Sequence, residues 1–226
     1  AEPIGLDAEV QKILERFTVA DRRGLVLLGP SGSGKTAAIE GAVRKRRMSL
    51  GGSERKKGLV WQLTPARLIS GMSYLGQWQS RLIAIWKHAY RNGLILYIED
   101  MLGLFEAGVT RDSRACAADL IRAQMEVMPV RLVTEMTPEA WAIFREKDRA
   151  FAQQFLVLPL EGKSRDDSLE ILLGMISMLE SKHLCRFDHA VLPEVLGLYD
   201  RFDRTAVLPG KAISALERLA NTHARK

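Results

Sequence analysis

The stretch Gly29-Pro30-Ser31-Gly32-Ser33-Gly34-Lys35-Thr36 decides the fold expected for this chain of 226 residues. The apolar run 25–28 directly before it is typical of a buried strand, and residues 35–48 after it are typical of a helix. Glycines let the backbone curl so that several N–H groups point at one anion, and the N-terminus of the helix adds partial positive charge. The complete spacing G-x-x-x-x-G-K-T between a strand and a helix therefore predicts a phosphate-binding loop.

This loop predicts that the chain binds ATP together with Mg²⁺. The ammonium of Lys35 can reach the β- and γ-phosphates, and the hydroxyl of Thr36 can be a ligand of Mg²⁺. The remaining predicted nucleotide contacts are the other residues of the loop: Gly29, Pro30, Ser31, Gly32, Ser33 and Gly34.

Two acidic residues follow a second buried apolar run, 94–98. In phosphate-loop enzymes an acid at this place commonly holds Mg²⁺, and a second acid activates the attacking water. We therefore expect Glu99 to be a Mg²⁺ ligand and both Glu99 and Asp100 to be catalytic. The usual order is Asp then Glu, and this chain reverses it. Because Asp100 is one methylene shorter than the usual base, it falls about 1 Å short, which can cost on the order of a hundredfold in rate.

Strands and helices alternate through about residue 160. The apolar runs that predict strands are 25–28, 59–63, 94–98, 130–134 and 155–158, and helical patterns lie between them. Such alternation predicts an α/β fold with a parallel sheet covered by helices. Only helical patterns follow, at 166–181, 189–199 and 209–222. We therefore predict a nucleotide-binding α/β domain over 1–160 and a small helical lid over 161–226.

Composition and charge exclude several classes of protein. Hydrophobic residues make up 47% and charged residues 27%, which is typical of a globular domain and not of a disordered chain. Two distant cysteines support neither a metal site nor a disulfide framework. No apolar run reaches the roughly 18 residues that span a membrane, and no signal-peptide pattern begins the chain, so a cytoplasmic location is expected.

The net charge of +6 raises the question of nucleic-acid binding. Its two basic clusters, 44–47 and 55–57, flank a glycine turn and contain no aromatic residue. A nucleic-acid surface would combine a continuous basic stripe with stacking residues. Nucleic acid is therefore not the expected partner.

With these motifs in place, the chain resembles the first ATPase module of the Clp/Hsp100 group of AAA+ proteins. Five segments carry the resemblance, in the family's order: 4–10, 71–78, 99–108, 145–155 and 208–213. The second is an aromatic residue between glycines, like the family's pore loop. The last, Leu208-Pro209-Gly210-Lys211-Ala212-Ile213, is similar to its sensor-2 region. Five matches in one order are much more specific than a phosphate loop alone.

The resemblance implies a five-stranded parallel sheet with a helical lid, in a homo-oligomeric ring, commonly a hexamer, that threads protein substrates. It implies that Tyr74 grips the substrate chain, since an aromatic ring offers contact area while flanking glycines let the loop move. It also implies that Lys211 lies near the γ-phosphate. The partners expected by this resemblance are ATP or ADP and a protein substrate or partner protein.

The chain departs from the family where hydrolysis is concerned. The family has two arginines directly before the position of Phe155, where this chain has Gln153 and Gln154. The polar residue expected at the end of the fourth strand is replaced by Met136, beside Glu135. An amide cannot supply an arginine's charge, and a thioether cannot orient a water. We therefore expect a module that binds ATP and hydrolyses it slowly.

Three functions remain open at this point. The first is a module of a protein-unfolding or remodelling ATPase, which Tyr74 favours. The second is a nucleotide-binding scaffold that supports assembly without hydrolysis, which Gln153, Gln154 and Met136 favour. The third is a nucleic-acid-associated AAA+ loader, which only the positive charge and the basic region 44–57 favour.

Overall fold

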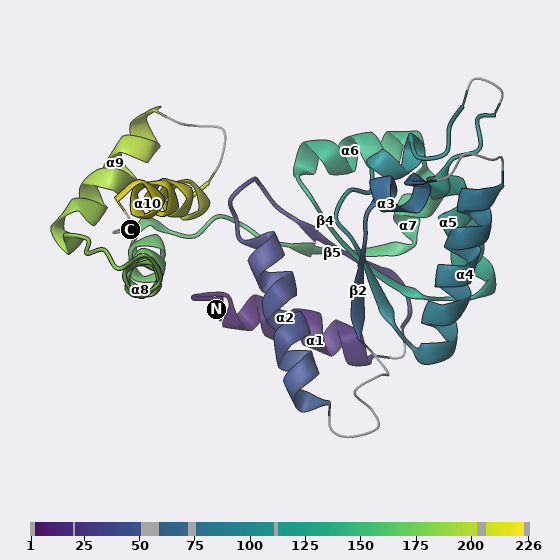
Figure 1. The fold of residues 1–226 in the computed structure, drawn as a ribbon, viewed down its shortest axis with the longest axis horizontal. Coiled ribbons are helices and arrows are strands. Elements are labelled where there is room, and N and C mark those ends of the chain that lie inside the picture. Colours follow the sequence, from purple (N-terminus) through teal and green to yellow (C-terminus); the bar gives the residue numbers. More distant parts are fainter. Residues whose placement is uncertain are drawn as a thin grey trace. The chain divides into compact units, whose positions relative to one another are not determined.

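One parallel sheet organises the chain (Figure 1). The computed structural model describes residues 3–19, 21–50, 59–71, 76–110, 113–202 and 207–223. The sheet has five strands in the order β2-β3-β4-β1-β5. Their bounds are β1 Gly24–Leu28, β2 Val60–Leu63, β3 Ile95–Ile98, β4 Arg131–Met136 and β5 Phe155–Pro159. The α/β fold and the five strands predicted from the sequence are confirmed.

The burial of a strand's residues follows its place in the sheet. All four residues of β3 are buried, as expected for a central parallel strand covered on both faces. Strand β2 lies at the edge of the sheet, and its two middle residues, Trp61 and Gln62, are exposed. The register is fixed by pairs such as Leu63 with Ile98 and Leu28 with Met136, so the strands end at a common edge.

Helices flank the sheet, and further helices form the C-terminal region. Those before the last strand are α1 Asp7–Thr18, α2 Lys35–Ser49, α3 Pro65–Ile69, α4 Gln77–Asn92, α5 Ala117–Val127, α6 Pro138–Lys147 and α7 Arg149–Gln153, with the 3-10 turn η2 Gly103–Phe105. Those after it are α8 Arg165–His183, η3 His189–Val191, α9 Leu192–Phe202 and α10 Gly210–His223. None of these described helices is long and apolar enough to cross a bilayer.

The helical pattern between the predicted strands 130–134 and 155–158 forms two helices in the structure, where the sequence indicated a single helix over 138–152. Asp148 has an extended backbone, with φ −151° and ψ 95°, and it ends α6 and begins α7. Its side chain accepts a hydrogen bond from the N–H of Phe151 at 2.9 Å, the usual role of a helix N-cap. The hydrophobic periodicity continues through this break, so it did not reveal the new helix start.

Two compact units are distinguishable in the chain. The sheet unit comprises Lys12–Leu28 and Ala42–Leu158, and the lid unit comprises Ala1–Gln11, Gly29–Gly41 and Pro159–Lys226. The division into 1–160 and 161–226 made from the sequence stays a prediction.

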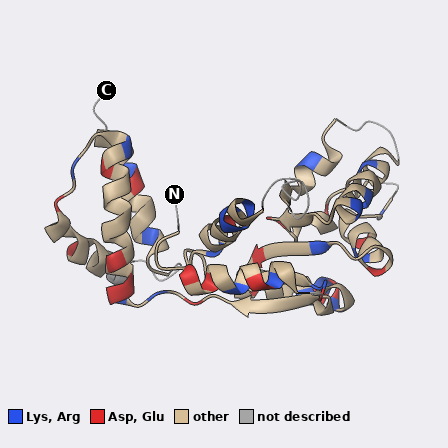
Figure 2. Cartoon of the chain, turned by 90° about the horizontal axis from the view of Figure 1, so that it is seen from below, with Lys and Arg blue, Asp and Glu red and all other residues tan. Residues whose placement is uncertain are grey.

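Charged side chains are spread along the chain. Figure 2 shows residues of both charge signs on the helices, so neither sign is confined to one segment.

Each unit has its own hydrophobic core. In the sheet unit the fully buried ring of Phe144 lies at the centre of an aromatic cluster, with ring centroids 5.3–6.0 Å away in Phe105, Trp141, Phe151 and Phe155. In the lid unit the core joins α8, α9 and α10 through buried residues that include Leu172, Leu192 and Leu216.

Candidate nucleotide-binding site

The loop between β1 and α2 has the conformation that its glycines make possible. Gly32 and Gly34 have φ of +85° and +89°. A side chain in this left-handed region costs roughly 1–2 kcal/mol, because Cβ approaches the following carbonyl oxygen. Both residues therefore turn the backbone tightly enough for α2 to begin at Lys35 with its N–H groups directed back toward the loop.

Gly29 is required for a different reason, which is space. A Cβ atom built on it would lie 2.0 Å from the carbonyl oxygen of Leu160 and 2.9 Å from Oγ of Ser33. Its φ is not in the positive range. The glycine therefore allows the segment after β5 to pass directly against the base of the loop.

Lys35 and Ser33 place polar atoms inside this loop. The Lys35 side chain folds over the loop, and Nζ donates to the carbonyl oxygens of Gly29 at 2.8 Å and Pro30 at 2.9 Å. Ser33 is 1% exposed, and its Oγ has no hydrogen-bond partner among the described residues. A buried hydroxyl without a partner is costly, and a phosphate oxygen would satisfy it. These residues fit a bound triphosphate.

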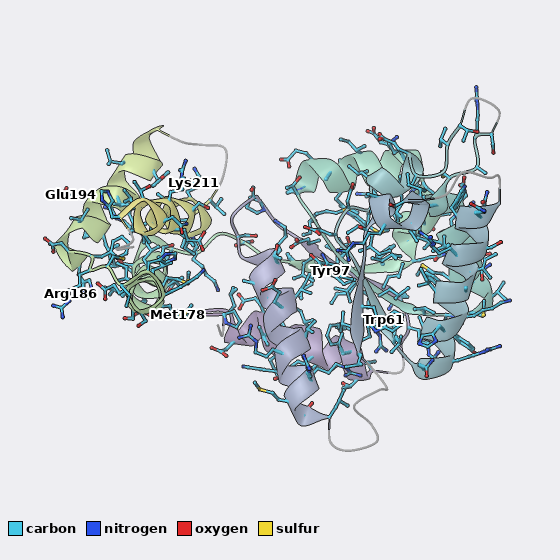
Figure 3. All side chains as sticks on the ribbon, viewed as in Figure 1. Trp61, Tyr97, Met178, Arg186, Glu194 and Lys211 are labelled. Carbon is cyan, nitrogen blue, oxygen red and sulfur yellow. The ribbon has the colours of Figure 1, made fainter. Side chains whose placement is uncertain are left out.

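The start of α10 packs against the same loop, within the lid unit. The N–H of Val207 donates to the carbonyl oxygen of Ser31 at 3.0 Å. A Cβ on Gly210 would lie 2.4 Å from Cα of Gly32, so the two backbones touch. Lys211, labelled in Figure 3, is the next residue and belongs to the first turn of α10. The sequence predicted a role for Lys211 but missed Val207 and Gly210, although the Pro-Gly pair was a turn signal.

The N-terminal segment also lies on this loop. A Cβ on Gly34 would lie 3.0 Å from Cδ1 of Leu6, which is buried. Glu9 forms an ion pair of 2.8 Å with Lys163, on the segment that leads into α8. The resemblance pointed to residues 4–10 without a reason, and these contacts supply one: the segment covers the outer side of the phosphate loop.

In the sheet unit, the two acids after β3 have different partners. Oε2 of Glu99 accepts a hydrogen bond from Nε2 of Gln62, on the neighbouring strand, at 2.9 Å. Oδ1 of Asp100 accepts from the N–H of Gly103 at 2.8 Å, so this carboxylate holds the turn that starts η2. Asp100 is therefore bonded within its own turn, whereas Glu99 is bonded to the neighbouring strand. Gln62 was not singled out from the sequence.

The last residue of β4 is buried. Met136 is 5% exposed, belongs to the hydrophobic core, and pairs with Leu28, the residue before the phosphate loop. Its neighbour Glu135 accepts a hydrogen bond from the hydroxyl of Tyr97 at 3.1 Å. The end of this strand therefore offers an apolar side chain where the resembled family has a polar one.

The remaining sequence-predicted positions fall in two groups. Gln153 is exposed, while the carbonyl oxygen of Gln154 accepts from the N–H of Gly24 at 2.9 Å. Tyr74 lies outside the described residues. In the described part of the chain no three His, Cys, Asp or Glu residues gather as a metal site, and Mg²⁺ bound through one or two protein oxygens and phosphates needs no such group.

Comparison with known proteins gives the same family as the motifs. The chain is 26% identical over 218 residues to the chaperone protein ClpB of Aquifex aeolicus, and 28% identical over 221 residues to ClpB of Bdellovibrio bacteriovorus, each over 96% of this chain. The resemblance to the Clp/Hsp100 group of AAA+ proteins is confirmed. No protein-family model matches the chain.

Solved structures show that the fold is that of an Hsp104 module. The S. cerevisiae Hsp104–ADP complex has a TM-score of 0.80 at 22% identity and covers 99% of this chain. An S. cerevisiae Hsp104–casein complex has a TM-score of 0.81 at 21% identity. The chain spans 22–26% of those two ClpB relatives and 38% of each Hsp104 chain. It therefore matches only a part of each of these longer proteins.

Proposed function

We propose that this chain is an ATP-binding AAA+ module of a Clp/Hsp100-like protein-remodelling ATPase, and that it hydrolyses ATP slowly by itself. The observation that carries the proposal is the loop 29–36, with two left-handed glycines, a buried hydroxyl at Ser33 and the ammonium of Lys35 held across it. A loop of this form with a helix behind it is suited to binding a polyphosphate.

The residues of the proposed site would divide the work of binding ATP between them. The backbone N–H groups of the loop bind phosphate oxygens, and Lys35 neutralises the β- and γ-phosphates when they displace its two carbonyl partners. Thr36 and Glu99 would be the Mg²⁺ ligands, and bound Mg²⁺ would neutralise charge on the phosphates. Lys211, next to the backbone contact between Gly210 and Gly32, would report the state of the nucleotide to the lid.

Slow hydrolysis follows from three features of the chain. Gln153 and Gln154 cannot replace arginine fingers, which are worth roughly 10³–10⁵ in rate in related systems. Met136 is buried in the core and cannot position a water. The carboxylate of Asp100, although exposed, is bonded through Oδ1 to the N–H of Gly103, which holds it in its own turn. Glu99 is left as the acid that could activate a water.

Steady-state hydrolysis and nucleotide binding test this proposal together. We expect a fluorescent ATP analogue to bind in the presence of Mg²⁺, with turnover at least a hundredfold below that of an ordinary AAA+ ATPase. Lys35→Ala should abolish binding, whereas Lys182→Ala, the same change on an exposed part of α8, should not. Absence of binding, or equal binding by both variants, would disprove nucleotide binding. Fast turnover that requires Lys35 would disprove slow hydrolysis alone.

We also propose that the chain acts in a homo-oligomeric ring, in the cytoplasm, on a protein substrate that Tyr74 contacts. The support is the resemblance to ClpB and to Hsp104, one structure of which is described as a complex with casein. Tyr74→Ala within the assembled protein should abolish substrate handling while leaving nucleotide binding unchanged.

The second candidate is a scaffold that binds nucleotide without hydrolysing it, favoured by the amides at Gln153 and Gln154 and by the buried Met136. Under this alternative, Tyr74→Ala would have no effect, and ATP would change only the assembly state. The effect of Tyr74→Ala on substrate handling therefore separates the two candidates.

A further inference from the structure

A hydrogen bond joins Glu99, the acid proposed to hold Mg²⁺, to the neighbouring strand of the sheet. Nε2 of Gln62 donates to Oε2 of Glu99 at 2.9 Å. Gln62 lies on β2, and Glu99 directly follows β3. Both residues belong to the sheet unit, and both are exposed. A carboxylate only accepts hydrogen bonds, so the amide is the donor and the bond is charge-assisted.

The register of the two strands explains why this glutamine reaches this acid. Gln62 pairs with Tyr97, which Figure 3 labels, and Leu63 pairs with Ile98. Side chains two residues apart on a strand point to the same face, so Glu99 is the diagonal neighbour of Gln62. Diagonal neighbours in a sheet are about 7–8 Å apart, a distance that two long side chains can bridge. A shorter side chain at either position would not make this bond.

The length of the Glu99 side chain makes this hydrogen bond important. The usual acid at this place is Asp, and Glu has one more rotatable bond. A longer carboxylate at an exposed position can adopt more rotamers, and binding a metal ion requires most of them to be given up. A donor that already holds one oxygen of the carboxylate reduces this entropic cost. Asp100 cannot give Glu99 the same support, because a second carboxylate has no hydrogen to donate.

We propose that Gln62 is a positioning residue that orients the carboxylate of Glu99 for Mg²⁺. The inference rests on the proposed function, in which Glu99 is a ligand of Mg²⁺. By holding Oε2, the amide leaves Oε1 as the oxygen for the metal ion or for one of its waters. Groups that hold metal ligands in place typically contribute roughly 10–100-fold to metal affinity. Because this pair is exposed, we expect a contribution of about tenfold, at the lower end of that range.

The experiment measures Mg²⁺ binding separately from nucleotide binding and from hydrolysis. A fluorescent ADP analogue is bound to the chain in EDTA, and the complex is then titrated with Mg²⁺. We expect Gln62→Met, which keeps the length and removes the donor, to raise the Mg²⁺ concentration of half-maximal response about tenfold. The affinity in EDTA should stay unchanged. Asn221→Leu, which removes an exposed amide from α10, is the control and should change neither value.

A double-mutant cycle shows whether Gln62 acts through Glu99. In Glu99→Asp the carboxylate is one methylene shorter and no longer reaches the amide. Gln62→Met should therefore change the Mg²⁺ response of the Glu99→Asp chain by less than about twofold. A loss of about tenfold that persists in the Glu99→Asp chain would mean that Gln62 does not act through this carboxylate, and it would overturn the inference.

The other outcomes separate this inference from the proposal on which it rests. If the analogue does not bind to the parent chain at all, the proposed function is wrong and the inference falls with it. If the analogue binds and responds to Mg²⁺, but Gln62→Met responds like the parent, only the inference is wrong. If Gln62→Met fails to fold, Gln62→Thr replaces it under the same criterion, because threonine favours strands and is too short to reach Glu99.

Discussion

Replacing Gly29 by alanine tests whether the close packing at the base of the phosphate loop is as the structure has it. The added Cβ would lie 2.0 Å from the carbonyl oxygen of Leu160, whereas real Cβ contacts are essentially never under 3.0 Å. The backbone at Gly29 and the backbone at Leu160 must therefore move apart by about 1 Å. The obstacle is a backbone atom and not the end of a flexible side chain. We therefore expect Gly29→Ala to lower the free energy of unfolding by about 3 kcal/mol, the upper end of what overpacking typically costs.

The magnitude can be followed in two assays. For a chain of this size, 1 kcal/mol corresponds to roughly 2–4 °C in Tm, so Gly29→Ala should unfold roughly 6–12 °C below the parent. A 1 Å displacement of the loop should also cost at least one phosphate hydrogen bond, and therefore about tenfold or more in affinity for a fluorescent ATP analogue.

The same substitution at Gly197 is the matched control. Gly197 lies inside α9, and a Cβ there would meet only Nη2 of Arg165 at 3.7 Å. Alanine is favoured over glycine inside a helix by about 0.5–1 kcal/mol, so this variant should be slightly more stable than the parent. If Gly29→Ala unfolded at the parent's temperature and bound the analogue equally well, the reasoning about Leu160 would be refuted.

Three further predictions concern the sheet unit. Phe144→Ala should lower the free energy of unfolding by about 3–5 kcal/mol in urea denaturation, because it empties the centre of the aromatic cluster. Asp148→Ala should cost about 1 kcal/mol in the same assay, since the N–H of Phe151 loses its cap. The Arg23 guanidinium, through its side-chain hydrogen bond, lowers the pKa of Asp21 from 3.8 to about 2. The stabilisation that Asp21 provides should therefore be complete above pH 4 and be lost as pH falls through about 2, which NMR titration and unfolding at several pH values can follow.

Each of these predictions has a result that contradicts it. Exposed Ile143, next to Phe144 on α6, is the control: Ile143→Ala should cost less than 1 kcal/mol, and an equal loss at both positions would contradict the packing account. If Asp148→Asn, which keeps a capping oxygen, were as unstable as Asp148→Ala, the capping role would be wrong. A stability difference between Asp21→Asn and the parent that persists unchanged at pH 2 would contradict the ion pair with Arg23.

Much of the fold could be predicted because its signals are local. The apolar runs 94–98 and 130–134 are buried on both faces and became β3 and β4 within two residues. The strand order could not be obtained in this way, because it depends on which edges pair. The break at Asp148 was also missed, since a capping residue inside a continuous periodic pattern changes neither its length nor its period.

By itself the sequence determined the chemistry that we propose for this protein: a strand, a glycine loop, Lys35 and a helix can be recognised because the backbone proposed to bind phosphate is built from consecutive residues. Only the tertiary structure decided what surrounds that loop. Leu160 closes its base, Leu6 covers one side, and Val207 and Gly210 reach it from α10 and the residues before it. These contacts join positions far apart in the chain. The contacts depend on how well the shapes of distant segments fit together. Such a fit produces no regular spacing of residues, so it could not be predicted from the sequence.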